Sequence, residues 1–268
     1  MVASMGTRLI LRAVTIVTLA FIYLPLGVIF LYAFNERRVQ SWPITGFTLD
    51  WFAKAVVNEG ARDALITSLQ AALGATVVAI LLGSAAALAV QRYRFFGRET
   101  ISFLVILPIA LPGIVTGMAL NATFRTVGVD LGLATIIVGH ATFCVVLVYN
   151  NVLARLRRSV RSIEEASMDL GADSIQTFRF ITMPVLRTAL IAGGLLAFAL
   201  SFDEVIVTTF TAGQEQTLPL WILRNLSRPN QLPIVNVVAV FAIVLSVIPV
   251  YLAQRLAGAE VAGATGAR

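Results

Sequence analysis

Two acidic residues in this chain lie where a charge is costly. Asp203 and Glu204 are the only acids in the apolar segment 188–210. An ionised carboxylate in lipid costs at least about 2.5–3.5 kcal/mol, so both side chains should face a water-filled cavity or a partner. A carboxylate in such a cavity can bind a cation that crosses the membrane.

Hydroxyl side chains extend this polar feature. If segment 188–210 is one continuous helix, Ser201, Glu204, Thr208 and Thr211 recur at spacings of 3, 4 and 3 residues and form one stripe. Asp203 then lies about 100° away from the stripe. A helix face with hydroxyls and a carboxylate suits a hydrated pathway for a cation.

Two other roles for the acids remain open. They can pair with an arginine near the outer boundary of the membrane, such as Arg125 or Arg224. They can also lie at the membrane surface, where water solvates them. Both alternatives would make the acids structural.

The rest of the composition excludes most covalent and metal chemistry. The sequence holds one cysteine (Cys144), one histidine (His140) and one lysine (Lys54). These counts exclude an intrachain disulfide and the usual zinc sites. Lys54 follows an alanine, so the Gly-Lys-Ser/Thr of an ATP-binding phosphate loop is absent. We therefore predict that this chain is not an enzyme and binds no metal or cofactor itself.

Apolar composition indicates a membrane protein. Of 268 residues, 58% are hydrophobic and 13% are charged, and the mean hydropathy is +0.88. Soluble domains carry about 25% charged residues. A spanning helix needs about 20 mostly apolar residues. Six segments qualify, which predicts an all-α polytopic membrane protein with six transmembrane helices: 13–34, 64–91, 100–124, 131–154, 188–210 and 229–254.

Basic residues predict the orientation of these spans. With the N-terminus placed inside, thirteen of the 20 basic residues fall in cytoplasmic segments and seven in external ones. Lys and Arg are enriched in cytoplasmic loops. Both termini are therefore predicted to be cytoplasmic.

Two external segments are apolar but too short to cross the membrane. Residues 48–57 place Leu49, Phe52 and Val56 on one helical face, which is typical of an interfacial helix. Residues 218–222 are predicted to lie on the outer surface or to dip into it.

The cytoplasmic segment 155–187 forms a second candidate site. Ser162 and Glu165 have the spacing of a capping box, so we predict a helix that starts at Ser162. It should run to about Leu170 and stop at Gly171. From these residues alone, a docking helix and a solvated connector fit equally well.

This predicted helix has two distinct faces. Ile163, Ala166 and Leu170 make an apolar face. An acidic stripe on another face consists of Glu165, Asp169 and Asp173.

The spacing within the segment resembles a known motif. Glu165-Ala-Ser, three residues, Gly171, nine residues and Ile181-x-Met183-Pro184 is similar to the EAA loop of permease subunits of bacterial ABC importers. Ser167 and Met183 replace the usual Ala and Leu. The resemblance covers roughly residues 60–257 and implies a MetI-like type I importer fold. It also implies a coupling helix that docks on a separate ATPase through Glu165, Ala166, Ser167, Asp169, Gly171 and Pro184.

A second resemblance concerns the solute. Residues 201–210, followed by Leu218-Pro-Leu220, are similar to the corresponding stretch of the C-type permease of spermidine/putrescine transporters. This implies half of a translocation pathway for a small organic cation, above all a polyamine. The alternative is the same role for another small solute, such as an amino-acid derivative or an opine. A more distant alternative is an ATP-independent channel or secondary transporter, which would need no docking loop.

The family resemblance also implies partners and a location. The partners would be a second permease of a different chain, two copies of an ATPase that uses ATP and Mg²⁺, and an extracytoplasmic solute-binding protein, with no nucleic acid. The location would be the bacterial inner membrane. We divide the chain into an N-terminal span with its external segment (1–60), a transport core (61–257) with the coupling loop at about 160–184, and a disordered tail (258–268).

Overall fold

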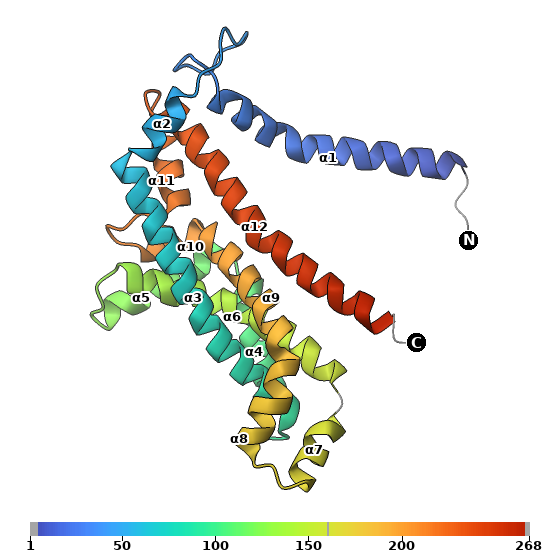
Figure 1. The fold of residues 1–268 in the computed structure, drawn as a ribbon. Coiled ribbons are helices and arrows are strands. Elements are labelled where there is room, and N and C mark those ends of the chain that lie inside the picture. The colour runs from blue at the N-terminus through green and yellow to red at the C-terminus, as the bar shows by residue number, and fades with distance from the viewer. Residues whose placement is uncertain (1–4, 160, 266–268) are drawn as a thin grey trace. The chain divides into compact units, whose positions relative to one another are not determined.

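The computed structural model describes residues 5–159 and 161–265, with side chains up to residue 256. Regular structure in these residues is helical (Figure 1), apart from one isolated bridge between Asn35 and Phe47. Five helical segments are long and apolar enough to cross a membrane, and a bent helix pair makes a sixth if it counts as one span. The all-α prediction and the predicted windows are confirmed.

The long helices match the predicted windows closely. They are α1 (Met5–Ala33), α3 (Glu59–Arg92), α6 (Leu133–Arg158), α9 (Met183–Phe202) and α12 (Leu232–Thr265). The short helices lie between them: α2 (Asp50–Val56), α4 (Arg98–Ala110), α5 (Gly113–Thr126), α7 (Arg161–Asp169), α8 (Ser174–Thr177), the π-helical η1 (Phe178–Thr182), α10 (Ile206–Thr211) and α11 (Leu218–Asn225).

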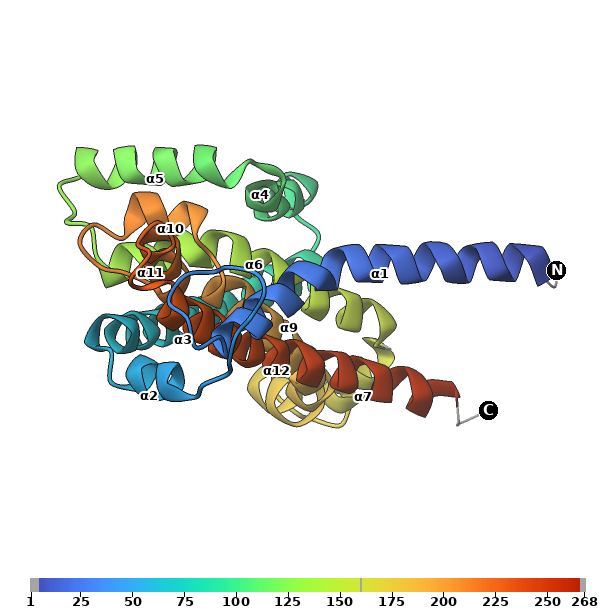
Figure 2. The ribbon, with the colours of Figure 1, turned by 90° about the horizontal axis from the view of Figure 1, so that it is seen from above.

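The third predicted span is broken. The chain bends by 106° between α4 and α5. Figure 2 shows α4 nearly end-on beside α5, which lies across the view. Leu111 is extended, with ψ 144°, because the following Pro112 disfavours the helical conformation. Pro112 also has no N–H to donate to a continuing helix. Pro108 and Pro112 predict a kink in the span over 100–124, and the structure shows this kink as a full break between two helices.

The chain divides into two compact units. One consists of residues up to Arg62 together with Ile222–Ile243, and the other of Asp63–Trp221 together with the chain from Val244 onward. The first unit ends close to the predicted boundary at residue 60. That residues 222–243 belong to the first unit was not predicted.

Helix α2 packs within the first unit through an indole. Trp51 is buried and donates from Nε1 to the carbonyl of Asn35 at 2.8 Å, and Ala55 is buried one turn later. The short helix over 48–57 is thus confirmed. Its predicted apolar face is partly open: Leu49 and Val56 are both 66% exposed, whereas the ring of Phe52 packs on that of Phe34 with centroids 4.9 Å apart.

The core of the second unit lies between α6 and α9. Tyr149 and Val152 on α6 are buried in one cluster with Leu186 and Ala197 on α9. Ala79 of α3 joins the same cluster. Small side chains let transmembrane helices approach closely. This packing holds α6 and α9 as a frame for the shorter helices that follow them.

The C-terminal segment differs from its prediction. Helix α12 continues to Thr265, so residues 258–265 are helical where we predicted disorder. Alanine has the highest helix propensity, and extending an existing helix avoids the cost of nucleation. Residues 266–268 lie outside the described residues.

Candidate functional site

The coupling-loop helix α7 ends where the sequence predicts. Gly171 has φ +91°, a left-handed conformation that strains residues with a Cβ. The N–H of Ala172 donates to Ser167 O at 3.1 Å, and that of Gly171 donates to Met168 O at 2.9 Å. These two bonds form a Schellman motif, which satisfies the last carbonyls of the helix. Figure 1 shows α7 and α8 together at one end of the second unit.

The start of α7 differs from the prediction. The helix begins at Arg161, and the preceding Val160 lies outside the described residues. Glu165 does not cap the helix start but pairs with the Arg161 guanidinium at 3.0 Å. An Arg and a Glu four residues apart lie on one helix face, which explains the pairing. The predicted capping box at Ser162 was therefore wrong.

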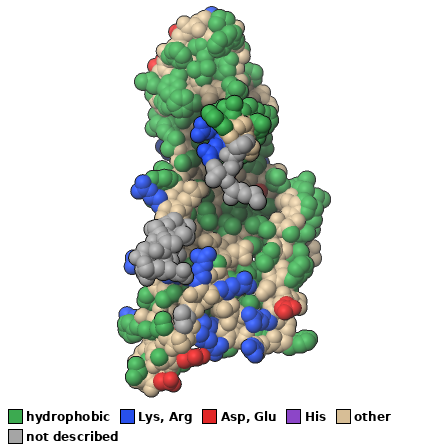
Figure 3. Space-filling view, turned by 90° about the vertical axis from the view of Figure 1, so that its right-hand side faces the viewer, with side chains coloured by type: hydrophobic (Ala, Val, Ile, Leu, Met, Phe, Trp, Pro, Cys, Tyr) green, Lys and Arg blue, Asp and Glu red, His purple; other side chains and the backbone are tan. Residues whose placement is uncertain are grey.

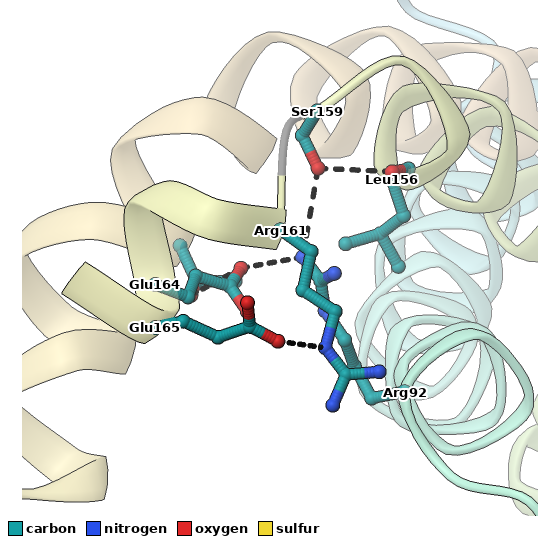
Figure 4. Close-up of polar contacts among 7 residues, drawn as sticks. Arg92, Leu156, Ser159, Arg161, Glu164 and Glu165 are labelled. Carbon is teal, nitrogen blue, oxygen red and sulfur yellow. Dashed lines mark hydrogen bonds and ion pairs between the residues drawn. The ribbon is translucent and has the colours of Figure 1, made fainter. Parts of the chain in front are cut away.

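An ion pair ties α7 to α3. Nη2 of Arg92, at the end of α3, contacts Glu164 Oε1 at 2.5 Å (Figure 4), and the two side chains are 14% and 17% exposed. Thr182 of η1 donates to the same carboxylate oxygen at 3.0 Å. Ser159, which caps α6, lies 3.5 Å from Arg92 Nη2. The Glu164 carboxylate thus connects α7 to α3 and η1, and Arg92 in turn contacts the end of α6.

The outer faces of α7 are unpartnered in the described structure. Ile163 is 55% exposed and Leu170 is 90% exposed, so the predicted apolar face does not pack on this chain. The acidic stripe is also exposed, and its members are Glu165, Asp169 and Asp173. Ser167 instead turns inward, to 3.3 Å from the Thr177 hydroxyl. An exposed face that carries both apolar and acidic groups can dock on a partner.

Basic side chains surround this end of the second unit. Figure 3 shows acidic side chains at the tip and basic side chains close above them. The segments next to α7 supply several arginines: Arg92, Arg155, Arg157, Arg158 and Arg187.

The two acids of the fifth span lie in a break between helices. Helix α9 ends at Phe202 and α10 begins at Ile206, so the prediction of one continuous helix was wrong. Asp203 Oδ1 accepts a hydrogen bond from the Ser246 hydroxyl at 2.7 Å. Glu204 Oε1 accepts one from the N–H of Val207 at 2.9 Å, which satisfies a free donor at the start of α10.

Neither acid is held by an arginine. Among the described residues, no ion pair joins an arginine to Asp203 or Glu204, whereas Arg92 pairs with Glu164 and Arg161 with Glu165. Arg125 donates to Asn121 Oδ1 at 2.9 Å instead. The alternative in which the two acids pair with arginines therefore has no support in this conformation.

The hydroxyls of the predicted stripe point into the protein. Ser201, Thr208 and Thr211 are at most 2% exposed. The Ser201 and Thr208 hydroxyls hydrogen-bond the ring of His140, and Thr211 donates to Val207 O at 3.0 Å. These three hydroxyls are engaged within the protein and are not free to bind a ligand in this conformation.

Glu204 lines a cavity at the bend between α4 and α5. The cavity holds about 170 Å³, and its elbow residues are Pro108, Ile109, Leu111, Gly113 and Thr116. Phe143, Leu200 and Val207 complete the lining. Thr116 Oγ1 is buried, with no hydrogen-bond partner among the described residues. One carboxylate and one hydroxyl therefore accompany an otherwise apolar surface, which we call the elbow cavity.

Family membership follows from the sequence of most of the chain. Residues 79–260 match the family described as binding-protein-dependent transport system inner membrane component. The chain belongs to this family. The permease is thus a transport component and a multi-pass protein of the inner membrane.

Named relatives cover most of the permease. The spermidine/putrescine transport system permease protein PotC of Haemophilus influenzae is 34% identical over 93% of this chain and 97% of its own length. The putrescine transport system permease protein PotI of Escherichia coli K12 is 34% identical over 82% of this chain and 80% of its own. A putative 2-aminoethylphosphonate transport system permease protein of Salmonella typhi is 29% identical over 81% and 82%.

Solved structures share the fold of the permease. A chain of a bacterial ABC transporter that imports the acidic polysaccharide alginate superposes with a TM-score of 0.73 at 16% identity, over 95% of this chain and 99% of that one. The inward-facing MetNI methionine ABC transporter gives 0.60 at 16%, over 80% and 99%. The predicted MetI-like fold is confirmed.

Several residues of both sites were missed from the sequence. Arg92 and Thr182 surround Glu164, and Thr116 faces Glu204. Arg92 and Glu164 are 72 residues apart, and no local pattern joins them. The available signal was helical register: Glu164 precedes the motif residue Glu165 and lies about 100° away from it around α7, so the two side chains leave on different faces.

Proposed function

We propose that this permease is one of two permease subunits of an ABC importer for polyamines. Sequence similarity carries the proposal: relatives named as spermidine/putrescine or putrescine permeases are 33–34% identical to this chain. The matched regions cover between 80% and 97% of the relatives' own lengths, so the sequence similarity extends over most of each protein. The motif around Asp203 and Glu204 adds a local reason.

The elbow cavity supports a cationic solute. An ammonium group that sheds water needs charge-assisted contacts, and a carboxylate supplies them. Glu204 would bind one ammonium group of the solute, with the Thr116 hydroxyl as a second ligand. The methylene chain of a polyamine would lie along the apolar lining. Asp203, which is exposed in the same break, would attract the cation before it enters.

The remaining residues of the predicted pathway would act indirectly. Ser201, Thr208 and Thr211 would shape the wall behind Glu204, because their hydroxyls are occupied in this conformation.

Coupling to ATP would use α7. Its docking set would comprise Glu165, Ala166, Ser167, Asp169, Gly171 and Pro184, extended by the exposed Ile163 and Leu170. The buried Arg92–Glu164 pair would carry movement of the docked helix to α3. ATP and Mg²⁺ would bind to the ATPase and not to this chain.

The complete importer would need further chains. We infer a second permease, two ATPase copies and an extracytoplasmic solute-binding protein. A related alginate transporter was solved with a periplasmic protein that carries the solute, which supports the last partner. Thirteen of the 20 basic residues fall on the predicted cytoplasmic side, which supports cytoplasmic termini.

A second candidate solute has its own support. One relative is named for 2-aminoethylphosphonate, which carries a single ammonium group and an anionic phosphonate. The same permease role for such a small organic solute is the alternative to polyamines.

Uptake in cells tests the choice between these solutes. A strain that lacks this chain should lose uptake of labelled putrescine or spermidine, and the wild-type chain should restore it. Excess unlabelled polyamine should compete, whereas 2-aminoethylphosphonate should not. Unchanged polyamine uptake in the deletion strain, together with loss of another solute, would refute the polyamine assignment.

A further inference from the structure

A buried histidine reaches both sides of the break in the fifth span. His140 lies on α6 and is fully buried. Its Nδ1 is 2.7 Å from Ser201 Oγ on α9, and its Nε2 is 2.8 Å from Thr208 Oγ1 on α10. The three residues of the break, 203–205, lie between these two hydroxyls. One imidazole ring therefore bonds both helix ends.

The direction of these hydrogen bonds follows from Thr208. Its hydroxyl donates to the carbonyl of Glu204 at 2.8 Å. A hydroxyl has one proton to donate, so Thr208 Oγ1 must accept from Nε2–H of His140. Nδ1 then carries no proton and accepts from Ser201. With a neutral imidazole, these hydrogen bonds therefore run in one direction: Ser201 donates to His140, His140 donates to Thr208, and Thr208 donates to the Glu204 carbonyl.

This series of hydrogen bonds ends on the residue that lines the elbow cavity. The Glu204 carbonyl is held by Thr208, and Glu204 Oε1 accepts from the Val207 N–H. Both contacts come from the first residues of α10. The position of α10 therefore sets the direction of the Glu204 carboxylate.

Helix α10 is also seated tightly on α5. A Cβ at Gly117 would lie 2.6 Å from the ring of Phe210, so only glycine permits this approach. At the other end of the contact, a Cβ at Gly113 would lie 3.7 Å from Ile206 Cβ. A shift of α10 would thus move the wall of the elbow cavity together with Glu204.

We propose that His140 is a positioning residue that clamps α10 to α9 across the break and aims the Glu204 carboxylate into the elbow cavity. The clamp itself rests on hydrogen-bond geometry alone. Its effect on transport rests on the proposed function, because it requires that Glu204 contact the solute.

Disulfide formation between α5 and α10 tests the clamp. Gly113→Cys and Ile206→Cys would be introduced into the whole importer complex in a Cys144→Ala background. The spacing of their Cβ atoms, 3.7 Å, is within the range of disulfide-bonded cysteines. The initial rate of disulfide formation then reports how steadily α10 is held.

Four substitutions separate the clamp from general packing. Thr208→Val keeps the side-chain volume and removes the hydrogen bond between the ring and α10. His140→Ala removes the hydrogen bonds to both α9 and α10. Thr208→Val should slow disulfide formation by about fivefold, the effect of one buried hydrogen bond, and His140→Ala should slow it further because two bonds are lost. His140→Gln, whose amide supplies a donor and an acceptor, should restore most of the rate. The control is Tyr149→Phe, which removes a bond from α6 to Ser102 on α4 and should leave the rate unchanged.

Two results would overturn the clamp. One is a wild-type rate in Thr208→Val and His140→Ala complexes that assemble normally. The other is an equal loss of rate in Tyr149→Phe, which would indicate general loosening of α6.

Uptake measurements test the link from the clamp to Glu204. If Thr208 acts through Glu204, the double variant Thr208→Val, Glu204→Gln should transport no worse than Glu204→Gln alone. Additive losses would contradict that link. Normal uptake in Glu204→Gln, with disulfide formation still dependent on His140, would refute the proposed solute site and leave the clamp standing.

Discussion

At the scale of single residues, Glu204 has two separable roles. Its Oε1 caps α10 through the Val207 N–H, and its charge faces the elbow cavity. A glutamine keeps an acceptor oxygen for the cap and removes the charge. Substitution by glutamine therefore isolates the electrostatic role.

Glu204→Gln should reduce polyamine uptake strongly while the complex still assembles. Loss of one charge-assisted contact removes about 1.5–3 kcal/mol, or roughly 10- to 100-fold in occupancy of the site. Asp203→Asn should have a smaller effect, because Asp203 is more exposed. Glu215→Gln, at an exposed acid of a predicted external segment, is the matched control. Uptake close to that of wild type in the double Asp203→Asn, Glu204→Gln variant would show that both acids are structural.

The Arg92–Glu164 pair gives a second residue-scale prediction. Removal of one partner leaves a largely buried charge unpaired, which typically costs about 3–5 kcal/mol. Arg92→Gln should therefore lower the melting temperature of the complex and uncouple ATP hydrolysis from solute. The double variant Arg92→Gln, Glu164→Gln should recover part of both losses.

The exposed Arg161–Glu165 pair provides the comparison. A surface ion pair contributes about 0–1 kcal/mol, so Arg161→Gln should have little effect on the melting temperature. Equal changes of melting temperature and of coupling in Arg92→Gln and Arg161→Gln would show that the Arg92–Glu164 pair contributes no more than a surface ion pair.

At the scale of elements, the end of α7 depends on one backbone conformation. Gly171 has a positive φ, and a Cβ there would meet no atom within 4 Å. The cost of another residue is therefore conformational and not steric, about 1–2 kcal/mol. Gly171→Val should destabilise the end of α7 and weaken attachment of the ATPase by roughly 5- to 30-fold.

Asparagine is the matched control at this position. It tolerates the left-handed conformation better than other residues with a Cβ. Gly171→Asn should therefore retain most of the ATPase attachment, as measured by copurification from membranes. Full attachment in Gly171→Val would contradict a coupling role for this helix end.

Sequence patterns predicted the position of elements better than their continuity. Apolar windows located every long helix, because a span must carry few charges in lipid. The same windows could not show the break at Asp203, and the bend in the third span is indicated by Pro108 and Pro112 instead. A carboxylate can cap a new helix within the protein, and Pro112 can redirect one, without altering the apolar composition of the window.

For the candidate sites, too, the sequence predicted local features but not the contacts between distant segments. The spacing of Glu165 and Gly171 was enough to propose a coupling loop, because the motif is local in sequence. The ion pair of Arg92 and the bonds of His140 join distant segments, and only the fold brings them together. Thr208 was assigned to an open pathway because helical register gives the face of a residue but not its neighbours.

At the scale of the whole molecule, the orientation of the spans remains a prediction. In a Cys144→Ala background, a cysteine at Gln214 should react with a membrane-impermeant thiol reagent in intact cells. A cysteine at Phe96 should react only after the membrane is opened. Both positions are exposed in the structure, so burial does not protect either one. The reversed pattern would refute cytoplasmic termini.

ATP-driven uptake by the purified importer tests the central claim most directly. Proteoliposomes would contain this chain, its partner permease and the ATPase, with Mg-ATP on the ATPase side and binding protein with labelled spermidine or putrescine on the other. We predict accumulation of the polyamine that requires ATP and stops when this chain is omitted. Polyamine uptake that proceeds equally without ATP, or ATP-driven uptake of another solute with none of polyamine, would contradict the account.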